Sequence, residues 1–400
     1  MRRSILFVAP YLPLPASFGG ALRIYHLMRH IARDHQVSLL APGTRDQYPY
    51  LLELGKTFDV TMVPAETTAR QPASGAKRMA QLRSFASGTS FTESGAYNPR
   101  MQAAMDRLFA TRRIDLVQFE FPESALYRVP ESVPTVFDAH NVEHDLLERV
   151  ARSSASTAKR VFNQQEARKL RWLEPAIWER STIGVATSER DAAIIRNLSS
   201  TPVDVVPNGV DLEYVRQIPA TDSQAGHVTF TGAMRHQPNA DGVLWYATQV
   251  HPLVQEHIPD SHFTIAGADP PAPVRALHSP TISVTGSVDD VRPYLGAAQV
   301  AVVPLWSGGG TRLKILEAFA AGRPVVSTSI GAEGLDVKDG VHLLLADSPG
   351  AFANAVVRLS QDKDLSGRIV RQARDLVQKR YGWDRQAEQL VAVHNRVFGR

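Results

Sequence analysis

Cysteine is absent from this 400-residue sequence, which excludes disulfide bonds and thiolate metal sites. Long apolar runs are absent as well, and none approaches the ~18 residues that a membrane-spanning helix needs. Residues 5–9 resemble the core of a signal peptide, but Pro10, Pro13 and Pro15 cut the run short, so we interpret it as a first strand. These features together favour a reducing, cytoplasmic location.

Two nucleotide-binding fingerprints are also missing. No Gly-x-x-x-x-Gly-Lys-[Ser/Thr] segment occurs, which argues against a P-loop NTPase, and the three glycines at 308–310 lack the spacing of a dinucleotide site. No basic stripe interleaved with aromatic residues is present, so we expect no nucleic-acid partner. Residues 1–205 hold 26 Lys and Arg against 21 Asp and Glu. This small surplus leaves open either a contact with the inner face of a membrane or an ordinary solvated surface.

What the sequence does contain is a regular alternation of strand-length apolar runs with helix-length amphipathic segments. This alternation predicts an α/β protein whose parallel sheets are covered by helices on both faces. The length and a hydrophobic content of 44% suffice for two or three cores. The expected strands are 5–10, 37–40, 60–63, 116–120, 134–138, 183–187, 227–231, 262–266, 282–285, 300–305, 324–327 and 342–345.

The domain boundary is expected near residue 205, where a strand runs into the turn at 207–211. We expect an N-terminal domain of residues 1–205 and a C-terminal domain of residues 206–380. An amphipathic helix within residues 381–400 is expected to pack back on the first domain. Residues 66–100 are rich in Ser, Thr, Ala and Gly, and they predict a mobile loop, followed by a helix, that is suited to acceptor contacts.

The strongest functional signal lies in residues 306–317, Trp-Ser-Gly-Gly-Gly-Thr-Arg-Leu-Lys-Ile-Leu-Glu. This segment follows a buried apolar run and leads into a helix, for which Thr311 is the expected N-cap. Arg312 and Lys314 fall in the first turn, where the helix dipole disfavours cations by about 0.3–1 kcal/mol each. Because glycines and free amides at a helix start attract anions, we predict a diphosphate site here. A tight turn with two solvated basic side chains is the alternative.

A similar order of strand, glycine pair and helix occurs at Gly19, Gly20 and Arg23, with the turn expected at residues 17–20 and the helix at 21–33. This segment could hold a phosphate or a sugar oxygen, or it could only shape the turn.

Two further signals come from the second half. Three expected strands end in glycine, at 232, 267 and 286, where a base, ribose or phosphate could approach the backbone, although turns also need glycine for their own sake. Glu317 lies one helical turn from Lys314. It could accept hydrogen bonds from a ribose diol, or it could pair with that lysine.

His140, Glu143 and His144 match the His-x-x-Glu-His spacing of a zinc-peptidase family. That motif must lie within one helix so that both histidines face one metal, whereas here it directly follows an expected strand. The alternatives place His140 at the carboxyl end of that strand, where it could hydrogen-bond a bound sugar or cap the next helix.

Several segments, taken together, resemble family 4 of the retaining glycosyltransferases (glycosyl transferases group 1), which have the GT-B fold of two Rossmann-like domains facing across a cleft. The resemblance covers nearly the whole chain and is carried by residues 207–211, 230–239, 284–291, 303–335 and 381–383. It implies that the second domain binds a nucleoside-diphosphate sugar and the first an acceptor. It further implies transfer of a hexose with retention and without a metal or other cofactor, in glycan, polysaccharide or glycoconjugate biosynthesis. The acceptor would be a glycan, a lipid-linked molecule or a small molecule.

By motif position, the resemblance assigns catalytic roles to His140 and Lys314, and we take Arg235, the nearest candidate for the family's phosphate-binding arginine, as the third catalytic residue. Lys314 would contact the diphosphate and His140 the donor sugar, while Glu317 would bind the ribose. The full set of expected donor-binding residues is Gly19, Gly20, Gly232, Arg235, Gly309, Gly310, Thr311, Arg312, Lys314 and Glu317.

The sequence departs from the family pattern at two places. The family commonly has two glutamates eight positions apart, but Gly309 stands where the first would be. The family's phosphate-binding Arg and Lys early in the second domain also lack their usual spacing, which leaves Arg235 or Arg312 as candidates. The competing functions are a sugar-nucleotide hydrolase or epimerase of the same fold, a zinc peptidase and a non-catalytic nucleotide-binding protein.

Overall fold

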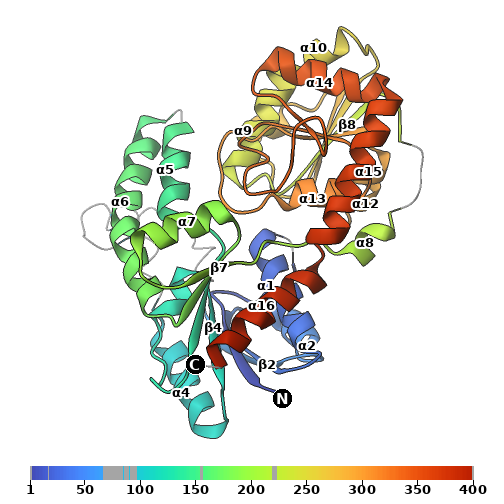
Figure 1. Cartoon of the computed structure of the whole chain (residues 1–400). Coiled ribbons are helices and arrows are strands. Elements are labelled where there is room, and N and C mark those ends of the chain that lie inside the picture. Colours follow the sequence, from blue (N-terminus) through green and yellow to red (C-terminus); the bar gives the residue numbers. More distant parts are fainter. Residues whose placement is uncertain are drawn as a thin grey trace. The chain divides into compact units, whose positions relative to one another are not determined.

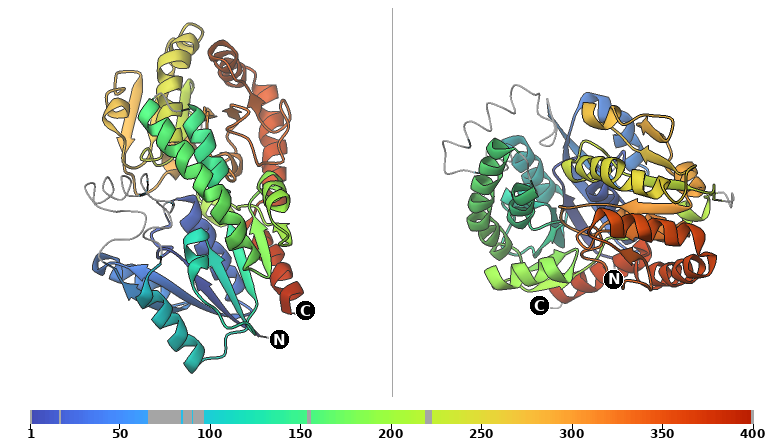
Figure 2. Two further views of the ribbon diagram at one scale, coloured as in Figure 1. Left: turned by 90° about the vertical axis from the view of Figure 1, so that its left-hand side faces the viewer. Right: turned by 90° about the horizontal axis from the view of Figure 1, so that it is seen from above.

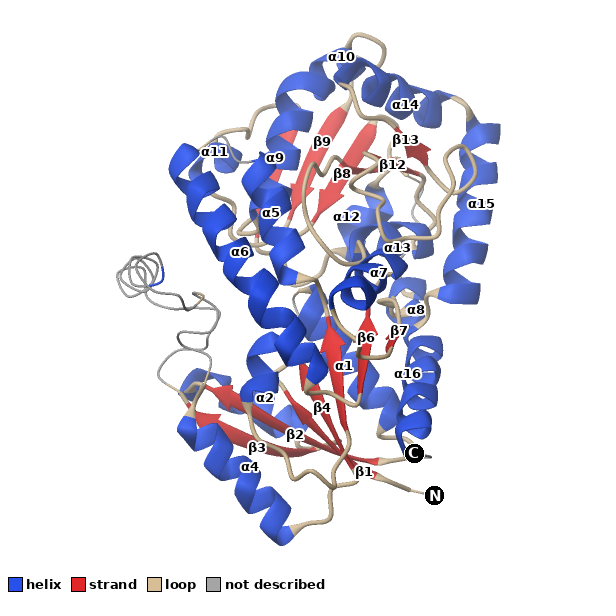
Figure 3. Ribbon diagram, turned by 60° about the vertical axis from the view of Figure 1, so that its left-hand side comes forward, coloured by secondary structure: helices blue, strands red, loops and turns tan. Residues whose placement is uncertain are grey.

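The computed structural model describes residues 2–16, 18–65, 84, 90, 97–153, 156–218 and 223–398. The chain divides into two compact units: unit 1 is Met1–Pro207 with Trp383–Arg400, and unit 2 is Asn208–Gly382. Each unit has a parallel β-sheet with helices packed against it (Figure 3). The loop expected at 66–100 lies almost entirely outside the described residues. None of the described helices is long and apolar enough to cross a membrane.

Unit 1 contains a seven-stranded sheet in the order β3-β2-β1-β4-β5-β6-β7. Neighbouring strands pair in parallel, with Ser4 opposite Gln36 and Ile5 opposite Leu116. The strands are β1 Ser4–Val8, β2 Gln36–Gly43, β3 Asp59–Pro64, β4 Leu116–Glu120, β5 Thr135–Ala139, β6 Ile183–Ala186 and β7 Val203–Val205.

Helices cover the unit 1 sheet. The paired helices α5 and α6 form a hairpin, drawn in green in both views of Figure 2. The helices, including two short 3₁₀ segments, are α1 Gly19–Ile31, η1 Arg45–Gln47, α2 Tyr48–Leu54, α4 Pro99–Thr111, η2 Pro122–Leu126, α5 Glu143–Ser153, α6 Thr157–Glu179, α7 Glu189–Leu198 and α16 Trp383–Phe398.

Unit 2 contains a six-stranded parallel sheet in the order β10-β9-β8-β11-β12-β13. Its strands are β8 His227–Thr231, β9 His262–Ala266, β10 Ile282–Gly286, β11 Val300–Val303, β12 Val325–Ser327 and β13 Leu344–Leu345. Its helices, with one π-helical turn, are α8 Leu212–Arg216, α9 Gln237–Trp245, η3 Tyr246–Val250, α10 His251–Gln255, α11 Ala272–Arg275, α12 Arg292–Ala297, α13 Leu313–Ala320, α14 Pro349–Gln361 and α15 Lys363–Arg380.

The strand order reverses once in each sheet. β1 lies between β2 and β4, and β8 lies between β9 and β11. At such a reversal the connections that leave the two central strands run to opposite faces of the sheet, so the carboxyl ends of these strands are the usual ligand-binding edge of an open α/β sheet. In unit 2 this edge carries the segment between β11 and α13, and in unit 1 it carries the segments after β1 and β4.

The C-terminal helix α16 belongs to unit 1, where it lies beside α1 (Figure 1). The ring of Trp383 stacks on His26, with centroids 5.3 Å apart and planes 3° from parallel. At the other end of the helix, the guanidinium carbon of Arg3 lies 4.7 Å from the centre of the Phe398 ring. The apolar side of α16 is therefore buried against the first strand and helix of the chain.

Arg23 does not hold a ligand, as one interpretation of the glycine pair had it, but forms an internal ion pair. Its side chain is fully buried, and its Nε and Nη2 donate to the Asp138 carboxylate at 2.8 and 3.1 Å. Its Nη1 also donates to the carbonyl of Pro207 at 3.2 Å. Because α1 begins at Gly19, Arg23 lies more than one turn into the helix and points into the interior of unit 1.

We predict that Trp383→Ala destabilises unit 1 by about 3–5 kcal/mol, because it removes a large side chain that is only 4% exposed. Trp172→Ala is the matched control, since Trp172 is 85% exposed and its loss should change the free energy of unfolding by no more than about 0.5 kcal/mol. Urea unfolding followed by circular dichroism measures both. Equal effects of the two substitutions would show that α16 does not stabilise unit 1.

A second prediction concerns the buried ion pair. Asp138→Leu should cost about 3–5 kcal/mol, because it leaves the Arg23 guanidinium buried without its counter-charge. The double variant Arg23→Met/Asp138→Leu should recover most of that loss, since an apolar pair of similar volume needs no compensation. Denaturant unfolding of the two single variants and the double variant gives the coupling free energy. Simple additivity of the two single effects would contradict this assignment.

Candidate active site

The polar side chains of unit 2 gather at the carboxyl ends of β8 and β11. Gly232 follows β8 with a φ of 150°, and a Cβ atom built there would lie 3.1 Å from Lys314 Nζ and 3.0 Å from Asn239 Nδ2. Glycine at 232 therefore leaves room for these two side chains to meet. Gly310, in the loop before α13, has a φ of 63°, a conformation that residues with a side chain rarely adopt.

Lys314 is half-buried in the first turn of α13, and its ammonium group has one neutral hydrogen-bond partner. Its Nζ donates to Asn239 Oδ1 at 2.6 Å and lies 4.2 Å from the centre of the Phe230 ring. Asn239 is itself fixed, because its Nδ2 donates to the carbonyl of Ala233 at 2.8 Å. Burial, together with the nearby charge of Arg312, lowers the pKa of Lys314 to about 7, while the charge of Glu317 acts in the opposite direction. The site thus holds a cation that a bound anion would stabilise.

The helix cap differs from the expectation. α13 begins at Leu313 with Arg312 at the N-cap position, so Thr311 is not the cap. The guanidinium of Arg312 turns back onto the loop, where Nη1 donates to the carbonyl of Gly309 and, at 3.1 Å, to that of Gly310. Arg312 is mostly buried, and it organises the glycine loop while keeping its positive charge at the start of the helix.

Glu317 lies one turn further along α13. Burial raises the pKa of its carboxyl, and the Lys314 charge opposes that rise. Tyr214 of α8 lies near enough for the Glu317 charge to contribute to its pKa, which burial and a hydrogen bond to Asp290 raise to about 12. The Tyr214 hydroxyl donates to Asp290 at 2.9 Å, and the guanidinium carbon of Arg292 lies 4.2 Å from the centre of the tyrosine ring.

Arg235 belongs to the neighbouring loop after β8. Its Nη1 donates to the Asp269 carboxylate at 3.0 Å, and both side chains are exposed. This pair ties the loop after β8 to the loop after β9. Lys314, Glu317, Arg312 and the glycine loop are therefore brought together on one segment, with Arg235 on the loop beside it.

Gly19 and Gly20 form the first turn of α1, whereas the sequence predicted a turn ahead of the helix. A Cβ atom at Gly20 would come within 2.6 Å of Tyr11 Oη and 2.7 Å of Phe121 Cζ. Gly20 therefore permits close packing of these two rings at the ligand-binding edge of unit 1.

His140 follows β5 and is almost completely buried. Its ring stacks on Phe121, with centroids 3.8 Å apart, and its Nε2 lies 2.6 Å from Glu120 Oε2. Phe121 has a φ of 67°, a strained value for a residue with a side chain, which turns the chain sharply after β4. Burial raises the pKa of Glu120 to about 7, and the Arg23 charge opposes that rise. Near neutral pH the pair can therefore hold a proton between Nε2 and Oε2.

Glu120 is held in turn by a series of buried hydrogen bonds that reaches α16. Gln118 Nε2 donates to Glu120 Oε1 at 2.7 Å, and His394 Nε2 lies 2.7 Å from Gln118 Oε1. Burial lowers the pKa of His394 to about 3, so its ring is neutral and donates from Nε2. Three residues, two on strand β4 and one on the C-terminal helix α16, thus determine where His140 lies. Sequence patterns did not single out Glu120, Gln118 or His394.

The zinc-peptidase pattern does not form a metal site. α5 begins at Glu143, so His140 lies outside the helix that contains His144. His144 Nδ1 lies 2.6 Å from Glu174 Oε2, and His140 is held by Glu120, so each histidine has its own buried carboxylate.

A different set of possible ligand atoms does converge in the described part of the chain. Atoms of Glu120, Asp138 and His140 lie within 4.8 Å of one another. However, the Arg23 guanidinium donates to the Asp138 carboxylate, and the Gln118 amide donates to the Glu120 carboxylate. A cation would have to displace these donors, so the three residues are better described as an ion-pair network.

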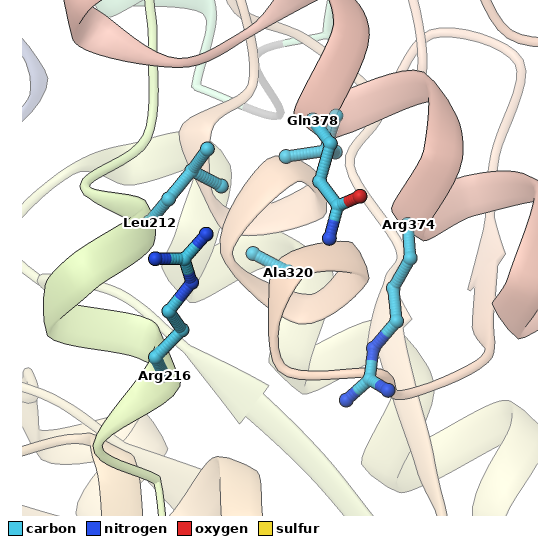
Figure 4. Close-up of a pocket in the computed structure, with 6 residues that line it drawn as sticks. Leu212, Arg216, Ala320, Arg374 and Gln378 are labelled. Carbon is cyan, nitrogen blue, oxygen red and sulfur yellow. The ribbon is translucent and has the colours of Figure 1, made fainter.

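A small pocket also opens at the far end of α13, lined by Leu212, Arg216, Ala320, Arg374 and Gln378 together with Val377 (Figure 4). Arg374 Nη2 donates weakly to the carbonyl of Ala321, the C-cap residue of α13, at 3.4 Å. A cation at this position complements the negative end of the helix dipole. The pocket is thus a helix-capping feature, separate from the Lys314 site in the first turn.

Comparisons with known proteins agree with this architecture. The family model Glycosyl transferases group 1 matches residues 225–362, and Glycosyltransferase Family 4 matches residues 19–214. An uncharacterized 44.6 kDa protein in the cps region of Klebsiella pneumoniae is 29% identical over 150 residues, which cover 35% of this chain and 38% of that protein. Phosphatidyl-myo-inositol mannosyltransferase of Mycobacterium leprae is 29% identical over 213 residues, 50% of this chain and 55% of that enzyme. The matched segments thus span about half or less of these relatives.

Solved structures show the same fold over the whole length. Sucrose-phosphate synthase from Thermosynechococcus elongatus has a TM-score of 0.72 at 17% identity and covers 100% of both chains. Anabaena HepE in complex with UDP and glucose has a TM-score of 0.67 at 16% identity, covering 98% of this chain and 100% of that one. Because one family model falls on each unit and the fold matches GT-B glycosyltransferases throughout, the chain belongs to the family 4 glycosyltransferases (glycosyl transferases group 1) and has the GT-B fold.

Proposed function

We propose that this glycosyltransferase moves a hexose, with retention of its anomeric configuration, from a nucleoside-diphosphate sugar to an acceptor hydroxyl. The observation that carries the proposal is the enclosed Lys314 at the start of α13, beside a glycine loop and with a pKa lowered to about 7. A cation held against the helix dipole and partly out of water gains most when a diphosphate with two negative charges binds next to it.

The diphosphate is assigned to Lys314 and to the backbone amides of Gly309, Gly310 and Thr311. Arg312 adds positive charge from beneath the loop, and Arg235 adds it from the neighbouring loop. As the bond to the sugar breaks, negative charge grows on the leaving diphosphate, and preorganised donors stabilise that charge without reorganising. We propose that this arrangement makes a metal ion unnecessary. The loop backbone would also take over sugar contacts from the glutamate that Gly309 replaces.

Glu317 is assigned to the ribose of the donor. A carboxylate accepts two hydrogen bonds from a vicinal diol, and its partial enclosure strengthens those bonds relative to water. Tyr214 lies close to Glu317 and would border the nucleoside. Gly232, which permits the approach of Lys314 to Asn239, belongs to the same donor site.

In unit 1, His140 is assigned to the sugar that is transferred, and Gly19 and Gly20 to backbone contacts with the donor. The Glu120 carboxylate fixes the ring of His140 and its pattern of protonation, so His140 would present a defined hydrogen-bonding group. We assign acceptor binding to this unit.

The named relatives suggest which substrates to try first. HepE was solved with UDP and glucose, and the Mycobacterium leprae relative is named for a phosphatidyl-myo-inositol acceptor and a mannosyl donor. We therefore propose a UDP- or GDP-linked hexose as donor and a glycan, lipid-linked or small-molecule acceptor. The enzyme would act in the cytoplasm, with contact to the inner face of the membrane, in polysaccharide or glycoconjugate biosynthesis.

The function is tested with nucleotide sugars and two substitutions. Thermal-shift screening of UDP-, GDP-, ADP- and TDP-sugars identifies the donor, and nucleoside diphosphate release is then measured with and without acceptors. Lys314→Ala should lower kcat by about 10²–10³, because it removes a donor from the charge that develops on the leaving group. Glu317→Ala should raise the donor KM by about tenfold to a hundredfold through lost charge-assisted hydrogen bonds.

Lys363→Ala is the matched control, since Lys363 is an exposed lysine at the start of α15 and should leave the kinetics unchanged. The anomeric configuration of the product, read from NMR coupling constants, tests retention. Equal donor consumption with and without acceptors would indicate a hydrolase or epimerase. Near-normal kinetics of both Lys314→Ala and Glu317→Ala would contradict the donor site.

The lowered pKa of Lys314 also predicts a pH dependence. Without ligand the ammonium loses its proton as the pH rises through about 7. A bound diphosphate favours the charged form, so binding above that pH takes up a proton, and donor affinity falls by up to about tenfold per pH unit. Titration calorimetry with UDP or GDP in buffers of different ionisation enthalpy measures the uptake. Lys314→Gln should abolish it; an unchanged uptake in that variant would assign the proton to another group.

A further inference from the structure

One tryptophan of this chain differs sharply from the other four. Trp172, on α6, is 85% exposed. Trp178 and Trp383 are buried, and Trp245 and Trp306 pack edge to face with ring centroids 5.0 Å apart. Trp172 is the most exposed large hydrophobic side chain in the described part of the chain. Tryptophan is enriched at interfaces where one part of its ring is apolar and the other is in water, so we consider Trp172 together with its neighbours on α6.

Trp172 stands in a basic surface that we call the Trp172 face. Helical spacing brings its members to one side of α6, because residues three, four, seven and eleven positions apart align. Its members are Arg160, Val161, Gln164, Arg168, Arg171 and Trp172, all of them exposed. With Lys159, α6 has four exposed basic side chains, and its one exposed acidic side chain is Glu179. None of the three arginines forms an ion pair with a described residue.

The opposite side of α6 is firmly packed, so the Trp172 face is not the by-product of a loosely held helix. Glu174 accepts hydrogen bonds from the backbone amides of Glu143 and His144 at 2.9 and 3.0 Å, which joins α6 to α5. Leu170, Ile177 and Trp178 are buried beneath the helix. The two helices lie side by side in Figures 1 and 2, which presents the Trp172 face on a rigid hairpin.

The chemistry of this face favours an anionic lipid surface over other partners. Val161 and Trp172 are eleven residues apart, which separates the two apolar anchors by about 16 Å along the helix axis. The three arginines, which have no ion-pair partner among the described residues, lie between and beside them. Arginine binds phosphate groups, and an indole ring prefers the boundary between headgroups and acyl chains. A helix with this combination lies along a membrane interface without crossing it.

We propose that the Trp172 face of α6 docks unit 1 on a bilayer rich in anionic phospholipid. Trp172 would enter the headgroup region, and Arg160, Arg168 and Arg171 would contact lipid phosphates. This proposal rests on the proposed function in one respect: docking would bring unit 1 to a lipid-linked acceptor. Vesicle binding needs no turnover, so the two proposals can fail separately.

The test uses the full-length protein with vesicles of phosphatidylcholine, alone or mixed with phosphatidylglycerol. We expect the protein to sediment with the mixed vesicles only, and the bound fraction to fall as salt is added. Arg168→Glu/Arg171→Glu should weaken vesicle binding at least about tenfold, because each basic side chain at an anionic surface contributes separately. Arg100→Glu/Arg107→Glu on α4 is the matched control, with the same change of charge at two exposed arginines of unit 1.

Trp172 supplies a second readout. Its fluorescence should shift to shorter wavelength with mixed vesicles, and Trp172→Phe should remove that shift, because Trp178 and Trp383 are buried and Trp245 and Trp306 are half-buried. Melting temperatures confirm that each variant is folded. The proposal is overturned if the protein ignores mixed vesicles, or if both double variants bind equally. It is also overturned if the wavelength shift persists in Trp172→Phe, or if polyglutamate but not lipid binds the face, which would identify an acidic protein as the partner.

Discussion

The position of the Lys314 ammonium group is the constraint on which the functional edge of unit 2 depends. Three effects disfavour a cation there: partial burial, the positive end of the α13 dipole and the neighbouring Arg312. Asn239 offers only a neutral oxygen, and the Phe230 ring offers only its face. Gly232 makes the approach possible because it has no side chain. The fold therefore keeps a poorly compensated positive charge at Lys314, which an anion bound beside it would stabilise.

In unit 1, by contrast, the buried charges discussed above have polar or charged partners. Arg23 is matched by Asp138, and Glu174 receives donors from Glu143 and His144. Glu120 is held between Gln118 and His140. These pairs are compensated inside the unit, so they specify position without attracting a ligand. In the proposed function, unit 2 would contribute binding energy for the anionic donor, and unit 1 would contribute a histidine in a defined orientation.

Much of the fold could be predicted from the sequence because its signals are local. β4, β8, β9 and α16 lie at the residues predicted for them, since apolar runs or periodic faces end at clear turn signals. The short helices α2, α8 and α11 were not predicted, because a few residues carry too little periodicity to be recognised. The start of α1 was placed too late because two glycines normally indicate a turn.

The candidate site was predictable only in part. The glycine loop, Lys314 and Glu317 form one continuous segment, so a local motif could identify them. The contacts that hold them, and those that hold His140, join residues far apart in the chain: Arg23 and Asp138 are separated by 115 positions, and Gln118 and His394 by 276. Such pairs depend on which strands become neighbours, which no single-sequence pattern specifies. Of the two interpretations left open for the segment with Arg23, a ligand contact was considered for this reason, because the partner Asp138 lies on a distant strand.

The two ends of the chain share one core, and this has a consequence for the order of assembly. Unit 2 is one continuous stretch, so its hydrophobic core needs no residue that follows Gly382 in the chain. Unit 1 starts first but must wait for Trp383 to reach His26 and for His394 to reach Gln118. Domains generally fold as units during synthesis, with the earlier one first. Here the part that is translated first is completed last, and the sheet of unit 1 must remain partly uncovered while the ribosome makes all of unit 2.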